Sequence, residues 1–128
     1  MKYMLLVYLD ETALSETERE QCYVESAQLA QDLSASGKYL SAGPLHSVAT
    51  ATSVRVRNGK RLVTDGPFAE TREQLGGYYL IDARDLDEAM TIAERIPVAT
   101  VGTIEIRPVL EIKGLPEQSK NADKGNRE

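Results

Sequence analysis

Residues 2–9 form a short apolar run whose two faces are both hydrophobic, and this run limits what the chain can fold into. Its length and its Tyr and Val content favour a strand over a helix. Successive strand residues point to opposite sides, which gives two apolar faces: Tyr3, Leu5, Val7 and Leu9 on one, Met4, Leu6 and Tyr8 on the other. Such a strand needs a covering layer on each side of its sheet.

Local signals place two helices between further strands. Ser15 and Glu18 have the spacing of a capping box, and Gly37 is a typical helix end, so a helix is expected between them. Asp85 is a favourable N-cap for a second helix, which Pro97 ends. The apolar stripe expected on the second helix is Leu86, Ala89, Met90, Ala93 and Ile96. Strands are expected at 38–45, 76–82 and 103–109.

Asn58 and Gly59 predict a tight hairpin between 53–57 and 60–64. Asn-Gly supplies the two positive φ angles of a type I′ turn, which also fixes the strand register. That register pairs Val54 with Val63, Arg55 with Leu62, and Arg57 with Lys60. One face then holds Val54, Val56 and Val63 with Arg61, and the other gathers Arg55, Arg57 and Lys60.

This order of elements, β-α-β, hairpin, β-α-β, predicts an α+β domain over residues 1–110. It fits a ferredoxin-like split β-α-β plan with an inserted β-hairpin, in which two helices cover one face of an antiparallel sheet. The apolar second face then needs another cover. The economical choice is a second copy, as a homodimer through the sheet face. Residues 111–128 are mostly polar and predict a mobile tail.

Composition narrows the function classes. The 128 residues carry a net charge of −5, which argues against direct nucleic-acid binding. A single cysteine, Cys22, forbids an intrachain disulfide and fits a reducing cytoplasm. The apolar N-terminal run is too short for a signal peptide or a membrane span. With one histidine, one cysteine and no cofactor motif, neither a metal site nor a cofactor is expected.

The stretch from Asp65 to Gly77 is the candidate site because it is polar, glycine-rich and placed between two strands. Asp65 and Glu70 are candidate acid or base residues, since neighbouring carboxylates in one pocket can acquire different pKa values. His46, the only histidine, is the natural proton shuttle. The alternative reading is structural: Asp65 begins a turn, and Glu70 and His46 are solvated.

Candidate ligand contacts surround this stretch. Arg55, Arg57 and Arg72 could clamp a carboxylate or phosphate, or they could form a solvated face with weak ion pairs. Phe68 is expected to anchor the loop in the core or at a dimer seam. Tyr78 and Tyr79 point to opposite sheet faces, one beneath the helices and one towards the partner, where a hydroxyl could bind a ligand.

The run Asp65-Gly66-Pro67-Phe68, followed by Glu73 to Tyr79, resembles the signature of the DGPF family within the YCII-related group. Ala42-Gly43-Pro44 and Arg107-Pro108-Val109 are similar to that pattern as well, and the likeness extends over about residues 1–110. The resemblance implies a homodimeric α+β barrel. It implies no assigned reaction, and it links the chain to accessory proteins of extracytoplasmic-function sigma factors. A histidine proposed for related proteins would fall near Ser26, where this chain has none.

Two functions remain open at this point. The first is a non-catalytic dimer that binds a small anionic ligand or a sigma-factor-type protein partner and acts in regulation. The second is a small cofactor-independent enzyme that transfers protons, isomerises or eliminates on a small anionic molecule.

Overall fold

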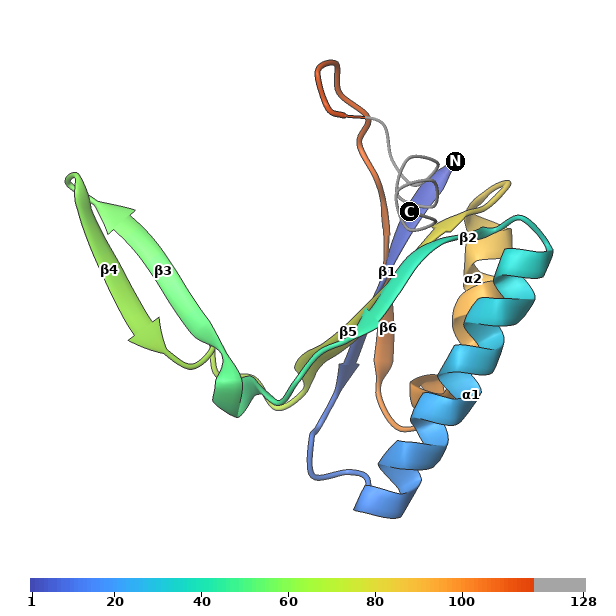
Figure 1. The fold of residues 1–128 in the computed structure, drawn as a ribbon, viewed down its shortest axis with the longest axis horizontal. Helices are drawn as coiled ribbons and strands as arrows, with labels where there is room; N and C mark the ends of the chain where they lie inside the picture. The colour runs from blue at the N-terminus through green and yellow to red at the C-terminus, as the bar shows by residue number, and fades with distance from the viewer. Residues whose placement is uncertain (117–128) are drawn as a thin grey trace, which may run out of the picture.

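The computed structural model describes residues 1–116, which form ten elements (Figure 1). In chain order these are β1 (Lys2–Leu9), α1 (Glu16–Ala35), β2 (Tyr39–Pro44), the 3₁₀ turn η1 (Val48–Thr50), β3 (Thr52–Arg57), β4 (Lys60–Asp65), β5 (Gln74–Asp82), α2 (Leu86–Glu94), the 3₁₀ turn η2 (Pro97–Thr100) and β6 (Thr103–Pro108). The part of the predicted mobile tail beyond residue 116 lies outside the described residues.

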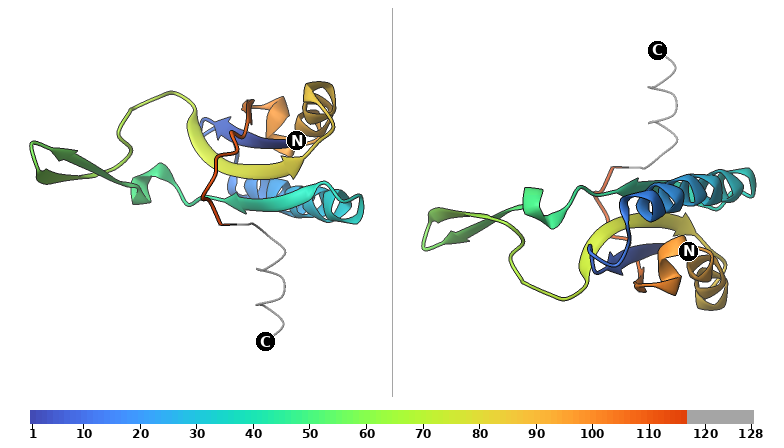
Figure 2. Two further views of the ribbon diagram at one scale, coloured as in Figure 1. Left: turned by 90° about the horizontal axis from the view of Figure 1, so that it is seen from above. Right: turned by 90° about the horizontal axis from the view of Figure 1, so that it is seen from below.

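The main sheet has the order β2-β5-β1-β6, with every neighbouring pair antiparallel. Both helices cover the same face, and the opposite face has no layer of its own among the described residues (Figure 2). This confirms the predicted ferredoxin-like α+β plan. We call the uncovered side the open sheet face.

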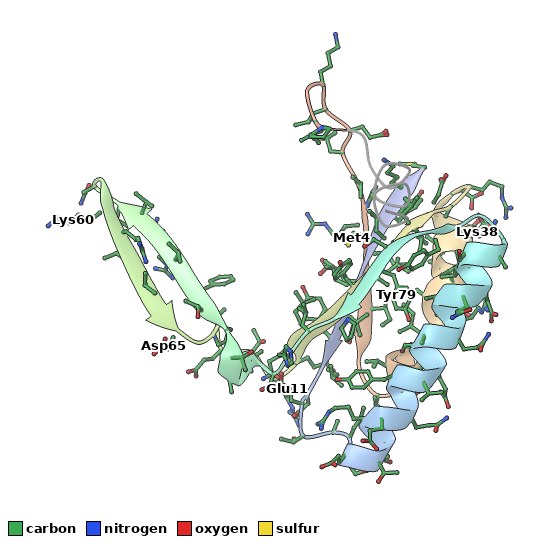
Figure 3. All side chains as sticks on the ribbon, in the orientation of Figure 1. Met4, Glu11, Lys38, Lys60, Asp65 and Tyr79 are labelled. Atoms are coloured by element: carbon green, nitrogen blue, oxygen red, sulfur yellow. The ribbon has the colours of Figure 1, made fainter. Side chains whose placement is uncertain are left out.

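The core lies between the sheet and the helices, around the fully buried side chains of Leu5, Leu33, Ile81 and Ile96. Along β1, Tyr3, Leu5 and Val7 face the helices and are buried, while Met4, Leu6 and Tyr8 on the open face are only partly covered. Figure 3 shows this alternation, with Met4 on the side away from α1 and Tyr79 between the sheet and α1.

Both predicted helix starts are present. The Ser15 hydroxyl accepts from the Glu18 amide at 3.1 Å, while the Glu18 carboxylate accepts from the Ser15 amide at 2.8 Å. Asp85 caps α2 by accepting from the Glu88 amide at 2.9 Å.

The predicted stripe of α2 was partly wrong. Leu86 and Met90 are exposed, whereas Ile92 is buried beside Ala89 and Ala93. Packing turns the Ala89–Ile92–Ala93 side of α2 to the sheet and leaves the flanking positions Leu86 and Met90 in solvent.

The inserted hairpin has the predicted turn and register. Asn58 and Gly59 take φ values of 53° and 74°, and Val54 pairs with Val63 as Arg55 does with Leu62. This two-stranded sheet, residues 52–65, projects away from the body on the open-face side (Figures 1 and 2). We call it the arm. Figure 3 shows Lys60 at its tip and Asp65 at its base.

No helix within residues 1–116 is long and apolar enough to cross a membrane.

Candidate functional site

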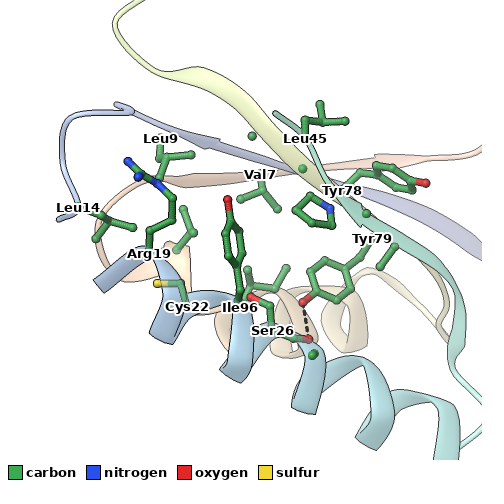
Figure 4. A pocket seen from close by; sticks show the side chains of 18 of the residues that line it. Val7, Leu9, Leu14, Arg19, Cys22, Ser26, Leu45, Tyr78, Tyr79 and Ile96 are labelled. Carbon is green, nitrogen blue, oxygen red and sulfur yellow. Dashed lines mark hydrogen bonds between the residues drawn. The ribbon is translucent and has the colours of Figure 1, made fainter. Parts of the chain in front are cut away.

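A cavity of about 950 Å³ lies between the N-terminal half of α1 and the helix-facing side of the sheet (Figure 4). We call it the α1 pocket. It exists because small residues line this region: Cys22, Ser26, Ala27 and Ala30 on α1, and Ala42, Gly76 and Gly77 on β2 and β5. Farther along α1, Leu29 and Leu33 fill the equivalent space and form core instead.

Arg19 brings a positive charge to this pocket. Its guanidinium Nη2 donates to the carbonyl oxygen of Glu11 at 3.0 Å. Within residues 1–116 no carboxylate forms an ion pair with it. Figure 4 shows the Arg19 side chain rising from α1 towards Leu9, beside Leu14. A partly buried arginine with free donors is a good receptor for a carboxylate or phosphate.

Tyr79 crosses the pocket from β5 and joins it to α1. Its hydroxyl donates to the Ser26 carbonyl oxygen at 2.9 Å, the dashed contact in Figure 4. Burial raises the pKa of the Tyr79 hydroxyl, so it remains a protonated donor at neutral pH. Tyr78 lies on the other sheet face, within 3.4 Å of the Ser41 hydroxyl. The two tyrosines therefore point to opposite faces.

Cys22 also lines the α1 pocket. Burial raises the pKa of its thiol, and the nearby carboxylates of Glu25 and Glu18 raise that pKa further. A raised pKa leaves little thiolate at neutral pH. The pocket thus presents Cys22 as a small apolar group and disfavours it as a nucleophile.

Glu11 connects the α1 pocket to a second cavity of about 410 Å³ near the Asp65–Gly77 loop. Its carboxylate accepts from the Ser47 hydroxyl at 2.8 Å and from the Val48 amide at 2.9 Å. Its own amide donates to the Gln74 side-chain oxygen at 3.3 Å. Glu11 therefore fastens the loop after β1 to η1 and to the start of β5.

The three candidate catalytic residues do not share one concave site. His46 lines the α1 pocket as an exposed side chain, and Glu70 lines the smaller cavity. Asp65 lines neither; it ends β4, exposed and paired in register with Thr52. Asp65 lies at the base of the arm, while His46 and Glu70 lie in the connections on either side of the arm and border different cavities.

The candidate ligand contacts are similarly dispersed. Arg55 and Arg57 lie on the arm, and Arg72 is exposed and lines neither of the two cavities. Phe68 is 78% exposed, so the loop is not anchored in the core of this chain. Of the predicted ligand contacts, Tyr79 crosses the α1 pocket; Tyr78 also borders it, although its ring lies on the open sheet face.

The Asp65–Gly77 loop has an evident structural role at the root of the arm. The Gly66 amide donates to the Ala51 carbonyl at 2.7 Å, and the Ser53 hydroxyl donates to the Gly66 carbonyl at 2.8 Å. Gly66 has a φ of 100°, which only glycine adopts readily. Farther on, Gln74 donates to the Thr71 carbonyl at 2.9 Å.

Sequence reasoning missed Arg19, Glu11 and the role of the small residues. One signal was available for Arg19, because it falls on the helical spacing that continues through Cys22, Ser26, Leu29 and Leu33. A charged residue at the start of an inward-facing stripe indicates a polar site or the mouth of a pocket. For Glu11, whose partners come from distant segments, the sequence offered no comparable signal.

Among residues 1–116, no group of histidine, cysteine, aspartate and glutamate side chains is arranged to hold a metal ion.

A ferredoxin-like sheet with a largely apolar, ligand-sized pocket under its first helix defines the class of this small α+β protein. The model of the YCII-related domain matches residues 1–113, and the chain belongs to this family. It is similar to an uncharacterised protein of Rhizobium meliloti (strain 1021), with 42% identity over 118 residues. That match covers 85% of this chain and 92% of the relative.

Proposed function

We propose that the protein binds a small organic anion with a substantial apolar part in the α1 pocket. Arg19 is the observation that carries this proposal, because its guanidinium enters a mostly apolar pocket without a carboxylate partner within residues 1–116. Burying a charge is costly unless it is paired. A ligand carboxylate or phosphate would supply the missing partner and up to two parallel hydrogen bonds.

The remaining walls suit the apolar part of such a ligand. Val7, Ile96 and Val98 contribute aliphatic surface below α1, and Ala27 and Ala30 contribute little bulk. The volume of about 950 Å³ is within the range of roughly 300–1,000 Å³ typical of small-molecule sites. These features support an amphipathic molecule, with its charged group at Arg19 and its apolar part towards Ile96.

Binding is favoured over catalysis by the groups in the pocket. Cys22 is held as a thiol and Tyr79 as a protonated donor, as their raised pKa values indicate. The acids Asp65 and Glu70 lie outside the pocket, which leaves His46 and Glu11, whose carboxylate accepts from Ser47 and Val48, as its acid–base groups. We propose a ligand-binding accessory or regulatory module, consistent with the resemblance to proteins linked to sigma factors.

We further propose that two copies pair through the open sheet face. Met4, Leu6 and Tyr8 on β1 stand beside Tyr78 on β5, and no layer among the described residues covers them. Burying such apolar side chains against a second copy removes them from water. Leu6→Glu is expected to yield monomers in sedimentation velocity runs. A wild-type chain that stays monomeric at high concentration would contradict the dimer.

The ligand proposal is tested with decanoate and decanol, which share a chain but differ in charge, each below its micellar concentration. Decanoate is expected to raise the thermal midpoint of the wild type, as ligands of the native state do. Arg19→Gln should weaken decanoate binding roughly tenfold or more in calorimetric titration.

Arg72→Gln is the matched control, because Arg72 is an exposed arginine outside the α1 pocket. It should bind decanoate as the wild type does. Equal decanoate affinity in the Arg19 and Arg72 variants, or no binding at all, would overturn the proposal.

A further inference from the structure

The arm presents an apolar face that nothing within residues 1–116 covers. Val54, Val56 and Val63 share this face, and all three are exposed. A two-stranded hairpin alone in water is marginally stable. An exposed apolar stripe on such a hairpin therefore indicates a surface that is covered in the functional assembly.

The root of the arm is braced, so its direction is set by the fold. Gly66 and Ser53 close the base through the bonds to Ala51 and Gly66 described above. Glu11 fixes the preceding turn through Ser47 and Val48. A segment that is already held in position at its base loses less conformational entropy when it binds a partner. The arm is thus prepared for a contact on one side of the molecule.

That side is the open sheet face, because the arm projects from the sheet opposite to both helices (Figures 1 and 2). Whatever covers the open sheet face therefore stands beside the arm. The six residues of β3 extend about 20 Å, and packed sheets lie about 10 Å apart. An arm of this length extends past the sheet of a protein packed on the open sheet face and reaches the level of that protein's helices.

The distribution of charge indicates which protein packs beside the arm. Residues 52–65 contain Arg55, Arg57, Lys60 and Arg61 against Asp65 alone, although the whole chain has a net charge of −5. The rest of the chain is correspondingly acidic. Both helices share this excess: α1 has Arg19 against five acidic residues, and α2 has acids and no base. A second copy therefore offers acidic helices at the level that the arm reaches, where Arg61, the base that shares the valine face, would meet them.

We propose that the arm of each copy packs its valine face against a second copy of this chain, the one that covers the open sheet face. This inference rests on the proposed homodimer and adds the arm to its interface. Phe68, exposed in the loop that follows the arm, would supply an aromatic contact there. The arm thereby gains a packing partner, which a two-stranded hairpin by itself lacks.

Two neighbouring residues of β4 provide the test. Leu62 and Val63 are 47% and 50% exposed and point to opposite faces of the arm. Val63→Glu places a charge on the valine face, and Leu62→Glu places the same charge on the basic face. In sedimentation equilibrium with the full chain, Val63→Glu should weaken self-association roughly tenfold or more. Leu62→Glu should stay within about threefold of the wild type.

Hydrogen exchange gives a second readout that does not depend on substitutions in the arm. Amides that bond across β3 and β4 should be protected in the dimer and lose protection on dilution or in Leu6→Glu. Concentration-independent exchange would overturn the proposal.

The outcomes separate the arm from the sheet-face dimer. If the wild type is a dimer and both β4 variants associate as it does, the arm is outside the interface and only the arm proposal fails. Equal weakening by both variants also overturns the assignment of the valine face. A monomeric wild type overturns the dimer and the arm together.

Discussion

The Tyr79 hydroxyl donates a hydrogen bond to the Ser26 carbonyl oxygen across 2.9 Å and so joins the central sheet to α1 beside the pocket. Tyr79→Phe removes this donor, while the Ser26 carbonyl keeps its backbone hydrogen bond within α1. We expect a loss of about 1–2 kcal/mol in the free energy of unfolding, measured by urea titration. Tyr39→Phe is the control, because the Tyr39 hydroxyl has no hydrogen-bond partner within residues 1–116. Equal losses in the two variants would contradict the role of this bond.

Alkylation of Cys22 reports the environment of the pocket. The thiolate is the reactive form, and the pKa of Cys22 is raised by burial and by Glu25 and Glu18. Reaction with iodoacetamide should therefore be slower than that of free cysteine at neutral pH, with its rate profile displaced to higher pH. Cys22 is the chain's only cysteine, so labelling is unambiguous.

Glu25→Gln should accelerate the alkylation of Cys22 by removing one of the charges that raise its pKa. Decanoate bound in the α1 pocket should slow it in the wild type. A rate profile displaced to lower pH would contradict the environment described here.

An alanine-to-leucine substitution on each of the two helices tests whether the α1 pocket is empty. Ala30 lines the α1 pocket, whereas Ala89 on α2 is fully buried in the core. Ala89→Leu should cost about 1–3 kcal/mol because it overpacks a filled region. Ala30→Leu should leave stability nearly unchanged and reduce decanoate affinity. Comparable destabilisation in the two variants would mean that the space beneath α1 is filled in solution.

The capping box of α1 should respond to acid. The pKa of Glu18 is lowered because its carboxylate accepts the Ser15 amide and interacts with the Ser15 hydroxyl. The stabilisation is therefore fully present above the ordinary pKa of 4.5 and is lost as pH falls through the lower folded-state pKa. The stability difference between the wild type and Glu18→Gln should shrink from about pH 7 to about pH 3.

Glu16→Gln is the control for this acid response, since Glu16 lies in the same first turn but does not close the box. Urea titrations across the pH range measure both differences. A wild-type minus Glu18→Gln difference that is constant with pH would contradict the mechanism.

Much of the fold could be predicted because its signals are local. The Ser15–Glu18 box, the Asn58–Gly59 turn and the two-faced β1 each depend on a few adjacent residues. The exposed Met90 shows the limit of such reasoning, because which side of α2 meets the sheet depends on packing and not on periodicity alone.

The candidate site was harder to predict because its parts are non-local. Asp65, Glu70 and His46 fall within a short stretch of sequence, but His46 and Glu70 border different cavities and Asp65 lines neither. The α1 pocket arises where small residues of α1 meet small residues of β2 and β5. A sequence does not indicate that two such surfaces face each other until the sheet order is known.

The α1 pocket owes its volume to side chains that are short, and this makes it easy to reshape during evolution. A single base change can lengthen Ser26 or Ala27 without disturbing Leu5, Leu33 or Ile81, which hold the fold together. Relatives with the same backbone could therefore diverge in ligand preference while keeping the same stability. Positions 22, 26, 27 and 30 are where such divergence should be sought among homologous chains.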